Sequence, residues 1–231
     1  MQAIMEPIFE TAYLIIVILL GILTLRAAKG RKQFILFGLM SIVLGCGDAF
    51  HLVPRMWALI TTGTTTLPQQ AAALGFGKLV TSITMTVFYV MLYHIWQLRY
   101  KKSSTRGLTI CIYLLAAARI ILCLMPQNQW LSPDAPLTWG IYRNIPFVVL
   151  GLIVIVLYFV QAQKSKDKPF SLMWLAITLS FLFYIPVVLF ADQNPTIGML
   201  MIPKTCAYVW IVLMGFWDAQ RQEKTTLQNG K

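Results

Sequence analysis

The stretch from Phe34 to Val53 reads FILFGLMSIVLGCGDAFHLV, and it decides what kind of fold this chain can form. The hydrocarbon core of a bilayer is about 30 Å thick, and a helix needs about 20 mostly apolar residues to cross it. The stretch has that length, and its apolar residues do not alternate strictly with polar ones, as they do in barrel strands. The sequence therefore predicts a membrane-spanning helix here.

Six further runs have the same character. With the first, they are Thr11 to Leu25, Phe34 to Val53, Ala71 to Trp96, Leu108 to Met125, Ile145 to Val160, Phe170 to Ala191 and Ile197 to Trp217. The chain of 231 residues is 58% hydrophobic and 12% charged, whereas about a quarter of the residues of soluble domains are charged. We therefore predict an all-α membrane bundle, with residues 1–231 forming a single domain of seven transmembrane helices.

Positive charge gathers in every second connection between these runs and at the C-terminus. The cations there are Arg26, Lys29, Arg31, Lys32, Arg99, Lys101, Lys102, Arg106, Lys164, Lys166, Lys168, Arg221, Lys224 and Lys231. Together with three acids on the same side, Asp167, Asp218 and Glu223, they account for the entire net charge of +11. Because loops rich in Lys and Arg stay in the cytoplasm, the pattern predicts an external N-terminus and a cytoplasmic C-terminus.

This charge pattern also bears on location and partners. We interpret the chain as an integral protein of a cell membrane, the bacterial cytoplasmic membrane, with membrane lipids as partners. Basic loops suit the anionic headgroups of the cytoplasmic leaflet. A role in binding nucleic acid is disfavoured, because the cations are scattered over four short segments instead of forming one patch.

Ionisable residues at membrane depth are the candidates for function, because each costs at least about 2.5 kcal/mol to place there. In the second run, Asp48, His51 and Arg55 follow i, i+3, i+7 spacing, which puts them on one stripe of a helix. A single face of the third helix carries Lys78, Ser82, Thr86 and Tyr89. Further candidates near the external ends of other helices are Glu10, Arg119, Arg143 and Lys204. The sequence thus predicts an outward-opening polar vestibule centred on Asp48.

Two interpretations of this cluster stay open. In the first, Asp48 pairs with Lys78, Arg119 or Lys204 and so neutralises buried charge between helices. In the second, the excess of cations over acids prepares a pocket for an anionic group such as a phosphate. The spacing of the histidines and cysteines predicts neither a metal site nor a cofactor, and we expect the four cysteines to be small core residues.

Gly47, Asp48 and Ala49, followed by Pro54 and Arg55, form a motif at the end of the second run. The segment of residues 34–55 that contains it resembles the signature helix of the lysoplasmalogenase-like membrane family. A looser similarity covers MIPKTCAYVW at residues 201–210. The chain departs from the family in having one span before the motif where the family usually has two.

The resemblance implies a compact multi-helix enzyme that hydrolyses the vinyl-ether bond of lysoplasmalogens and releases an aldehyde. Asp48 would be the catalytic acid, with Glu10 or His51 assisting. A lysophospholipid ligand would then be bound by Arg55, Lys78, Ser82, Tyr89, Arg119, Arg143 and Lys204. An alternative is a receptor or transporter that binds a small anionic solute without chemistry. A retinal Schiff base on Lys204 is disfavoured, because Leu200 stands where microbial rhodopsins carry an Asp.

Overall fold

The computed structural model describes residues 2–62, 68–100, 106–133, 135–165, 167–191 and 194–229. The α-helices are α1 (Gln2–Ala28), α2 (Lys32–Thr62), α3 (Pro68–Tyr100), α4 (Arg106–Leu124), α5 (Leu137–Lys164), α6 (Met173–Phe190) and α7 (Met201–Asn229), with short 3₁₀ helices η1 (Pro126–Asn128), η2 (Lys168–Phe170) and η3 (Pro195–Leu200). All seven α-helices are long and apolar enough to cross a membrane. The predicted all-α bundle of seven spans is confirmed, and the architecture is that of an integral membrane protein.

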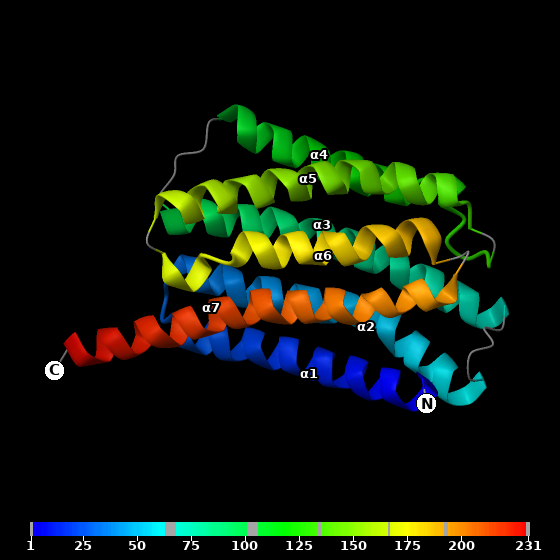
Figure 1. The fold of residues 1–231 in the computed structure, drawn as a ribbon, viewed down its shortest axis with the longest axis horizontal. Helices are drawn as coiled ribbons and strands as arrows, with labels where there is room; N and C mark the ends of the chain where they lie inside the picture. Colours follow the sequence, from blue (N-terminus) through cyan, green and yellow to red (C-terminus); the bar gives the residue numbers. More distant parts are fainter. Residues whose placement is uncertain are drawn as a thin grey trace.

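The helices run side by side with alternating direction, so the two termini lie at opposite ends of the bundle (Figure 1). α1 packs on α2 and α7, and α2 packs on α3. α5 packs on both α3 and α6. α4 lies at one edge of the bundle, against α3 and α5. Each helix thereby has one face toward the others and one face toward the surroundings.

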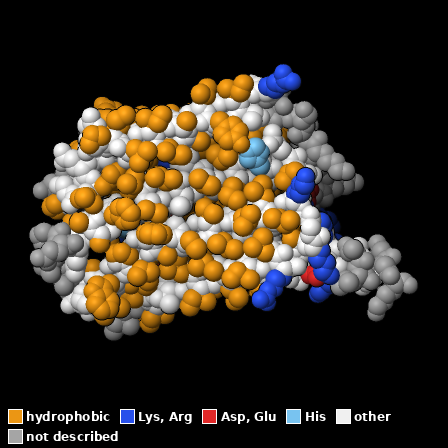
Figure 2. Space-filling model, turned by 180° about the vertical axis from the view of Figure 1, so that it is seen from behind, with side chains coloured by type: hydrophobic (Ala, Val, Ile, Leu, Met, Phe, Trp, Pro, Cys, Tyr) orange, Lys and Arg blue, Asp and Glu red, His pale blue; other side chains and the backbone are white. Residues whose placement is uncertain are grey.

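The surface of the bundle separates apolar from charged residues. Figure 2 shows apolar side chains over the middle of one face, with Lys and Arg side chains gathered at the end near the C-terminus. We call this the basic end, and the end that contains the N-terminus the opposite end. Exposed apolar residues on several helices, such as Ile16, Leu114 and Val156, belong to the surface that lipid would cover.

Two connections at the opposite end are shorter than the sequence indicated. The segment of residues 54–70 was expected to be a connection, but α2 continues to Thr62 and α3 begins at Pro68. Pro54 lies inside α2, as transmembrane helices allow when neighbouring groups satisfy the freed carbonyl. Likewise α5 begins at Leu137, so Arg143 lies in its second turn.

Three of the four cysteines contradict the expectation of core positions. Cys123 is buried, whereas Cys46, Cys111 and Cys206 are exposed. A membrane explains the difference, because an apolar thiol side chain on the lipid-facing surface carries no penalty there. Small apolar residues therefore mark the inside less reliably in a membrane bundle than in a soluble domain.

A largely buried charged cluster, in which Asp218 and Phe170 are buried and Arg99 and Asp167 are half-buried, joins three segments at the basic end. Arg99 at the end of α3 donates hydrogen bonds to both Asp167 oxygens, at 2.5 and 2.6 Å, and to Asp218 Oδ2 at 2.5 Å. Its guanidinium lies 3.9 Å from the centre of the Phe170 ring, and the Tyr100 hydroxyl donates to Asp167 at 2.9 Å. We call these five residues the Arg99 cluster. It ties α3 and α7 to the connection between α5 and α6.

Asp167 lies between two membrane spans. Burial alone would raise the pKa of its carboxyl, but the hydrogen bonds and charge of Arg99, together with the Tyr100 hydroxyl, hold that pKa below its ordinary value. Asp167 is therefore ionised at neutral pH, and the Arg99 cluster contains a true ion pair.

Close packing of α2 and α3 depends on Gly77. A Cβ atom at this position would overlap the carbonyl oxygen of Phe50 and the Cα of His51, which are backbone atoms of α2. We expect Gly77→Ala to lower the free energy of unfolding by about 1–3 kcal/mol, the usual cost of overpacking. Gly107→Ala is the matched control, because no atom of the described residues lies within 4 Å of a Cβ there. Thermal unfolding of both variants in detergent measures the difference, and equal midpoints would contradict the prediction.

Candidate functional site

Asp48 lies where α1, α2 and α7 meet. Its carboxylate is buried, and Oδ2 accepts a hydrogen bond of 2.6 Å from the Tyr13 hydroxyl of α1. Lys204, in the first turn of α7, is close enough for its charge to act on Asp48. No ion pair within 4.0 Å joins Asp48 to any of the described cations. The structure thus places Asp48 near Lys204 without a direct salt bridge.

Lys204 is a buried cation surrounded mainly by aromatic rings. Its Nζ lies 5.2 Å from the centre of the Tyr184 ring and 5.4 Å from that of Tyr208. Within the described part of the chain, its ammonium group makes no hydrogen bond and no ion pair. Aromatic faces attract a cation, but they leave the three N–H donors of lysine to another partner.

Arg119 is the second buried cation, and it is 1% exposed. Its guanidinium donates to Asn144 Oδ1 at 2.9 Å and lies 3.7 Å from the centre of the Phe147 ring. Longer hydrogen bonds reach the carbonyls of Arg143, at 3.3 Å, and Ser82, at 3.4 Å. Dipoles and a ring therefore surround this charge, and no described carboxylate lies within 4.0 Å of it.

Asn144 links the two buried cations. Its Oδ1 accepts hydrogen bonds from Arg119 and, at 2.8 Å, from the hydroxyl of Tyr184. The Tyr184 ring is one of the two that face Lys204. A polar network therefore runs from Arg119 on α4 through α5 and α6 to α7, and it ends next to Asp48.

The third-helix candidates have different surroundings. The Tyr89 hydroxyl is buried and shares a hydrogen bond of 3.1 Å with Ser180. Ser82 donates its hydroxyl to the Lys78 carbonyl at 2.8 Å, so it reaches Arg119 through its own carbonyl and not its side chain. The Lys78 side chain is exposed. Of these residues, Tyr89 is buried, Ser82 is half-buried and Lys78 is exposed.

Arg55 is engaged by two acids of α1. It forms an ion pair with Glu6 and lies 3.6 Å from Glu10 Oε1. The second Glu10 oxygen, Oε2, is buried and has no hydrogen-bond partner among the described residues. The same is true of His51 Nδ1. Buried polar atoms without a partner cost about 1–3 kcal/mol each, so both atoms are candidates for contact with a ligand or water.

Arg143 points to a different neighbourhood. Its Nη1 donates to Asn128 Oδ1 at 2.9 Å, and its guanidinium lies 4.1 Å from the centre of the Trp130 ring. Both partners belong to the connection between α4 and α5. The backbone carbonyl of Arg143 therefore accepts a hydrogen bond from Arg119, while the Arg143 guanidinium contacts the connection between α4 and α5.

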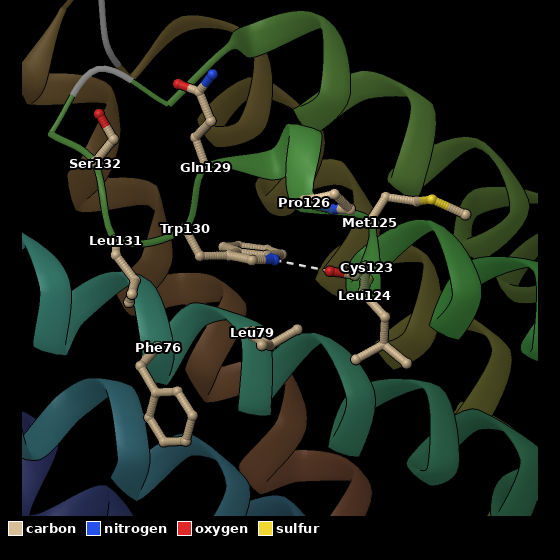
Figure 3. A pocket seen from close by; sticks show the side chains of 10 residues that line it. All are labelled: Phe76, Leu79, Cys123, Leu124, Met125, Pro126, Gln129, Trp130, Leu131 and Ser132. Atoms are coloured by element: carbon tan, nitrogen blue, oxygen red, sulfur yellow. Dashed lines mark hydrogen bonds between the residues drawn. The ribbon is translucent and has the colours of Figure 1, made fainter.

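Trp130 also lines a pocket with a volume of about 410 Å³ (Figure 3). It is lined by Phe76, Leu79, Cys123, Leu124, Met125, Pro126, Gln129, Trp130, Leu131 and Ser132. None of the ten predicted site residues lines it. The hollow is therefore a neighbour of the polar network, separate from the vestibule predicted around Asp48.

The sequence interpretation missed the uncharged residues that hold the network together. Tyr13, Asn144, Tyr184 and Tyr208 each contact a predicted ion or link two of them. A signal for Asn144 would have been an amide at membrane depth, but this residue directly precedes the fifth predicted run, Ile145 to Val160. The tyrosines gave no such signal, since they are common in transmembrane segments.

Comparison with protein-family models finds no match, and neither do comparisons with curated proteins and with solved structures. Within the described residues, no group of three or more His, Cys, Asp or Glu side chains could hold a metal ion.

Proposed function

We propose that this protein is a lipid-modifying hydrolase that cleaves the vinyl-ether bond of lysoplasmalogen-type lipids, with Asp48 as the acid. The observation that carries the proposal is the buried carboxyl group of Asp48 near Lys204, a buried cation that forms no salt bridge with the described residues. A phosphate held by Lys204 would bring an attached lipid chain into the neighbourhood of Asp48. The motif of Gly47, Asp48 and Ala49 that resembles lysoplasmalogenase-like proteins supports the same residue.

The reaction needs one proton donor that later takes a proton back. The Asp48 carboxyl group transfers its proton to the β-carbon of the vinyl ether, and an oxocarbenium ion forms at the α-carbon. The resulting carboxylate stabilises that cation. Water then adds to the α-carbon and returns a proton to Asp48. The hemiacetal so formed breaks into an aldehyde and a glycerophospho-headgroup alcohol.

Other residues position these groups. The Tyr13 hydroxyl fixes the orientation of Asp48, while Arg119 and Asn144 hold Tyr184 against Lys204. Glu10 Oε2 and His51 Nδ1 have unused hydrogen-bonding capacity, which suits them to bind water or a polar headgroup. The positive-inside rule supports an orientation with this site toward the outside of the cell and the basic end in the cytoplasm.

A second candidate function is binding or transport of a small anion without chemistry. It is favoured by the same buried positive charge, because neither Arg119 nor Lys204 has a described carboxylate within 4.0 Å. In that case Asp48 tunes the strength of binding and takes no part in a reaction. Product formation separates the two candidates.

The test uses the purified full-length protein in detergent. We expect aldehyde release from a 1-alkenyl lysophospholipid and none from its 1-acyl analogue, measured by derivatisation and mass spectrometry. In parallel, binding of glycerol 3-phosphate is measured by thermal shift. Anion binding without aldehyde would favour the receptor or transporter, and the absence of both would contradict the proposed site.

A further inference from the structure

The pocket lined by Trp130 opens on the lipid-facing surface of the bundle. It lies between α3, the end of α4 and the connection that follows, near the opposite end of the bundle (Figure 3). Three residues at its margin, Phe76, Leu124 and Leu131, are 51%, 61% and 63% exposed. In a membrane these side chains face the acyl chains or the headgroup boundary. An occupant can therefore enter sideways from the bilayer.

The pocket is held open by the local structure. Asn128 Nδ2 donates to the carbonyls of Leu122, at 2.6 Å, and Met125, at 2.9 Å, which satisfies the last turn of α4. The Trp130 indole donates to the Cys123 carbonyl at 2.8 Å, which fixes the ring across the pocket. On α3, a Cβ at Gly75 would overlap the Trp130 carbonyl, so this glycine allows the connection to lie close. Pre-formed pockets of about 300–1,000 Å³ with mainly apolar walls are typical ligand sites.

A positive charge lies against Trp130, one of the residues that line the pocket. The Arg143 guanidinium is 4.1 Å from the Trp130 ring centre, and its only hydrogen bond to a described side chain goes to Asn128. No described carboxylate lies within 4.0 Å of it. Gln129 and Ser132 also belong to the lining, and Figure 3 shows their polar ends directed away from the Trp130 ring. An apolar pocket bordered by a half-buried cation and amide groups complements an amphiphile with a negative head.

We propose that this pocket binds one acyl chain of an anionic membrane lipid, whose headgroup is held by Arg143. The hydrocarbon chain packs against Phe76, Leu79 and Leu124, while the phosphate of a phospholipid or the carboxylate of a fatty acid meets the guanidinium. Arg suits this role because its planar group presents several donors to such oxygens. The site is separate from Asp48 and does not depend on the proposed hydrolysis.

The test uses quenching of Trp130 fluorescence by brominated lipids. Full-length protein and the W130F variant are reconstituted in phosphatidylcholine vesicles that contain equal mole fractions of dibrominated phosphatidylglycerol or dibrominated phosphatidylcholine. The difference between the two proteins reports Trp130 alone. We expect stronger quenching of this component by the anionic lipid, loss of that preference in R143Q, and its retention in R143K. A third arm with dibrominated fatty acid in phosphatidylcholine vesicles distinguishes a carboxylate head from a phosphate head.

Several outcomes would overturn the proposal. Equal quenching by the anionic phospholipid, the fatty acid and the zwitterionic lipid would show ordinary contact with the bilayer. An unchanged preference in R143Q would remove Arg143 from the site. Leu79→Phe, which narrows the pocket, keeps the test informative if R143Q does not fold, and it should also weaken the preference. Asp48→Asn should leave the quenching as it is, so failure of the hydrolase proposal and failure of this one are distinguishable.

Discussion

Replacing Arg99 with leucine is expected to lower the free energy of unfolding by about 3–5 kcal/mol, the usual cost of removing one partner from a buried ion pair. Arg99 is the shared donor of Asp167 and Asp218, whose side chains are 13% and 3% exposed. Without it, two acids face each other at the junction of α3, α7 and the connection between α5 and α6. The ring contact with Phe170 is lost as well. Denaturant unfolding in mixed micelles measures the change.

The control for this prediction is Arg221→Leu, which removes an exposed cation from α7 near the same end of the bundle. It should shift stability by less than about 0.5 kcal/mol, as surface substitutions do. Adding Asp218→Asn to Arg99→Leu should recover part of the loss, because one carboxylate then no longer lacks its partner. A mild effect of Arg99→Leu, equal to that of the control, would show that the Arg99 cluster contributes little to stability.

The sequence was sufficient to predict the membrane-spanning helices, because each helix is determined by the residues within its own segment. A run such as that from Phe34 to Val53 has to be helical in a bilayer, whatever surrounds it, since every backbone polar group must be satisfied within the segment. The ends of the helices were less predictable. Pro54 and the residues before Arg143 look like loop segments in sequence, but packing against neighbouring helices keeps both regions helical.

The sequence predicted which ionisable residues belong to the site, but it did not predict which of them contact one another. The stripe of Asp48, His51 and Arg55 follows from helix geometry alone. The contact of Arg55 with Glu6 and Glu10 depends on how α1 packs on α2, which no spacing within one helix reveals. Arg119 shows the same limit, because its main partner Asn144 is an uncharged side chain on another helix. Charge alone suggested a carboxylate partner where the structure has an amide.

The Arg99 cluster and the Asp48 region differ in whether their cations are paired with carboxylates. At the basic end, one cation is matched by two acids at hydrogen-bonding distance. At the opposite end, Lys204 and Arg119 are buried without a carboxylate in ion-pair range among the described residues. The charge of Arg99 is already neutralised by its two acids. The charges of Lys204 and Arg119 remain available to an anionic ligand, and we therefore propose the functional site at Asp48 and not at Arg99.

Asp48→Asn is expected to reduce aldehyde release by about 10²–10⁴-fold, the range that a positioned general acid contributes. The amide keeps the size of the side chain and can still accept the hydrogen bond from Tyr13, but it cannot deliver a proton to carbon. Binding of the substrate should change much less, because Lys204 and its aromatic surroundings remain. Initial rates at saturating 1-alkenyl lysophospholipid measure the effect, and thermal shift with glycerol 3-phosphate measures whether anion binding is retained.

Two further variants make this result specific. Glu223→Gln is the same carboxyl-to-amide change at a surface ion pair with Lys29 at the basic end, and it should leave the rate unaltered. Tyr13→Phe keeps the carboxyl group but removes its 2.6 Å hydrogen bond, so it should lower the rate at each pH by less than Asp48→Asn and shift the pH profile. If Asp48→Asn retained the wild-type rate, the proton would have to come from another group. Glu10, with its unpaired buried oxygen, would then be the next acid to replace.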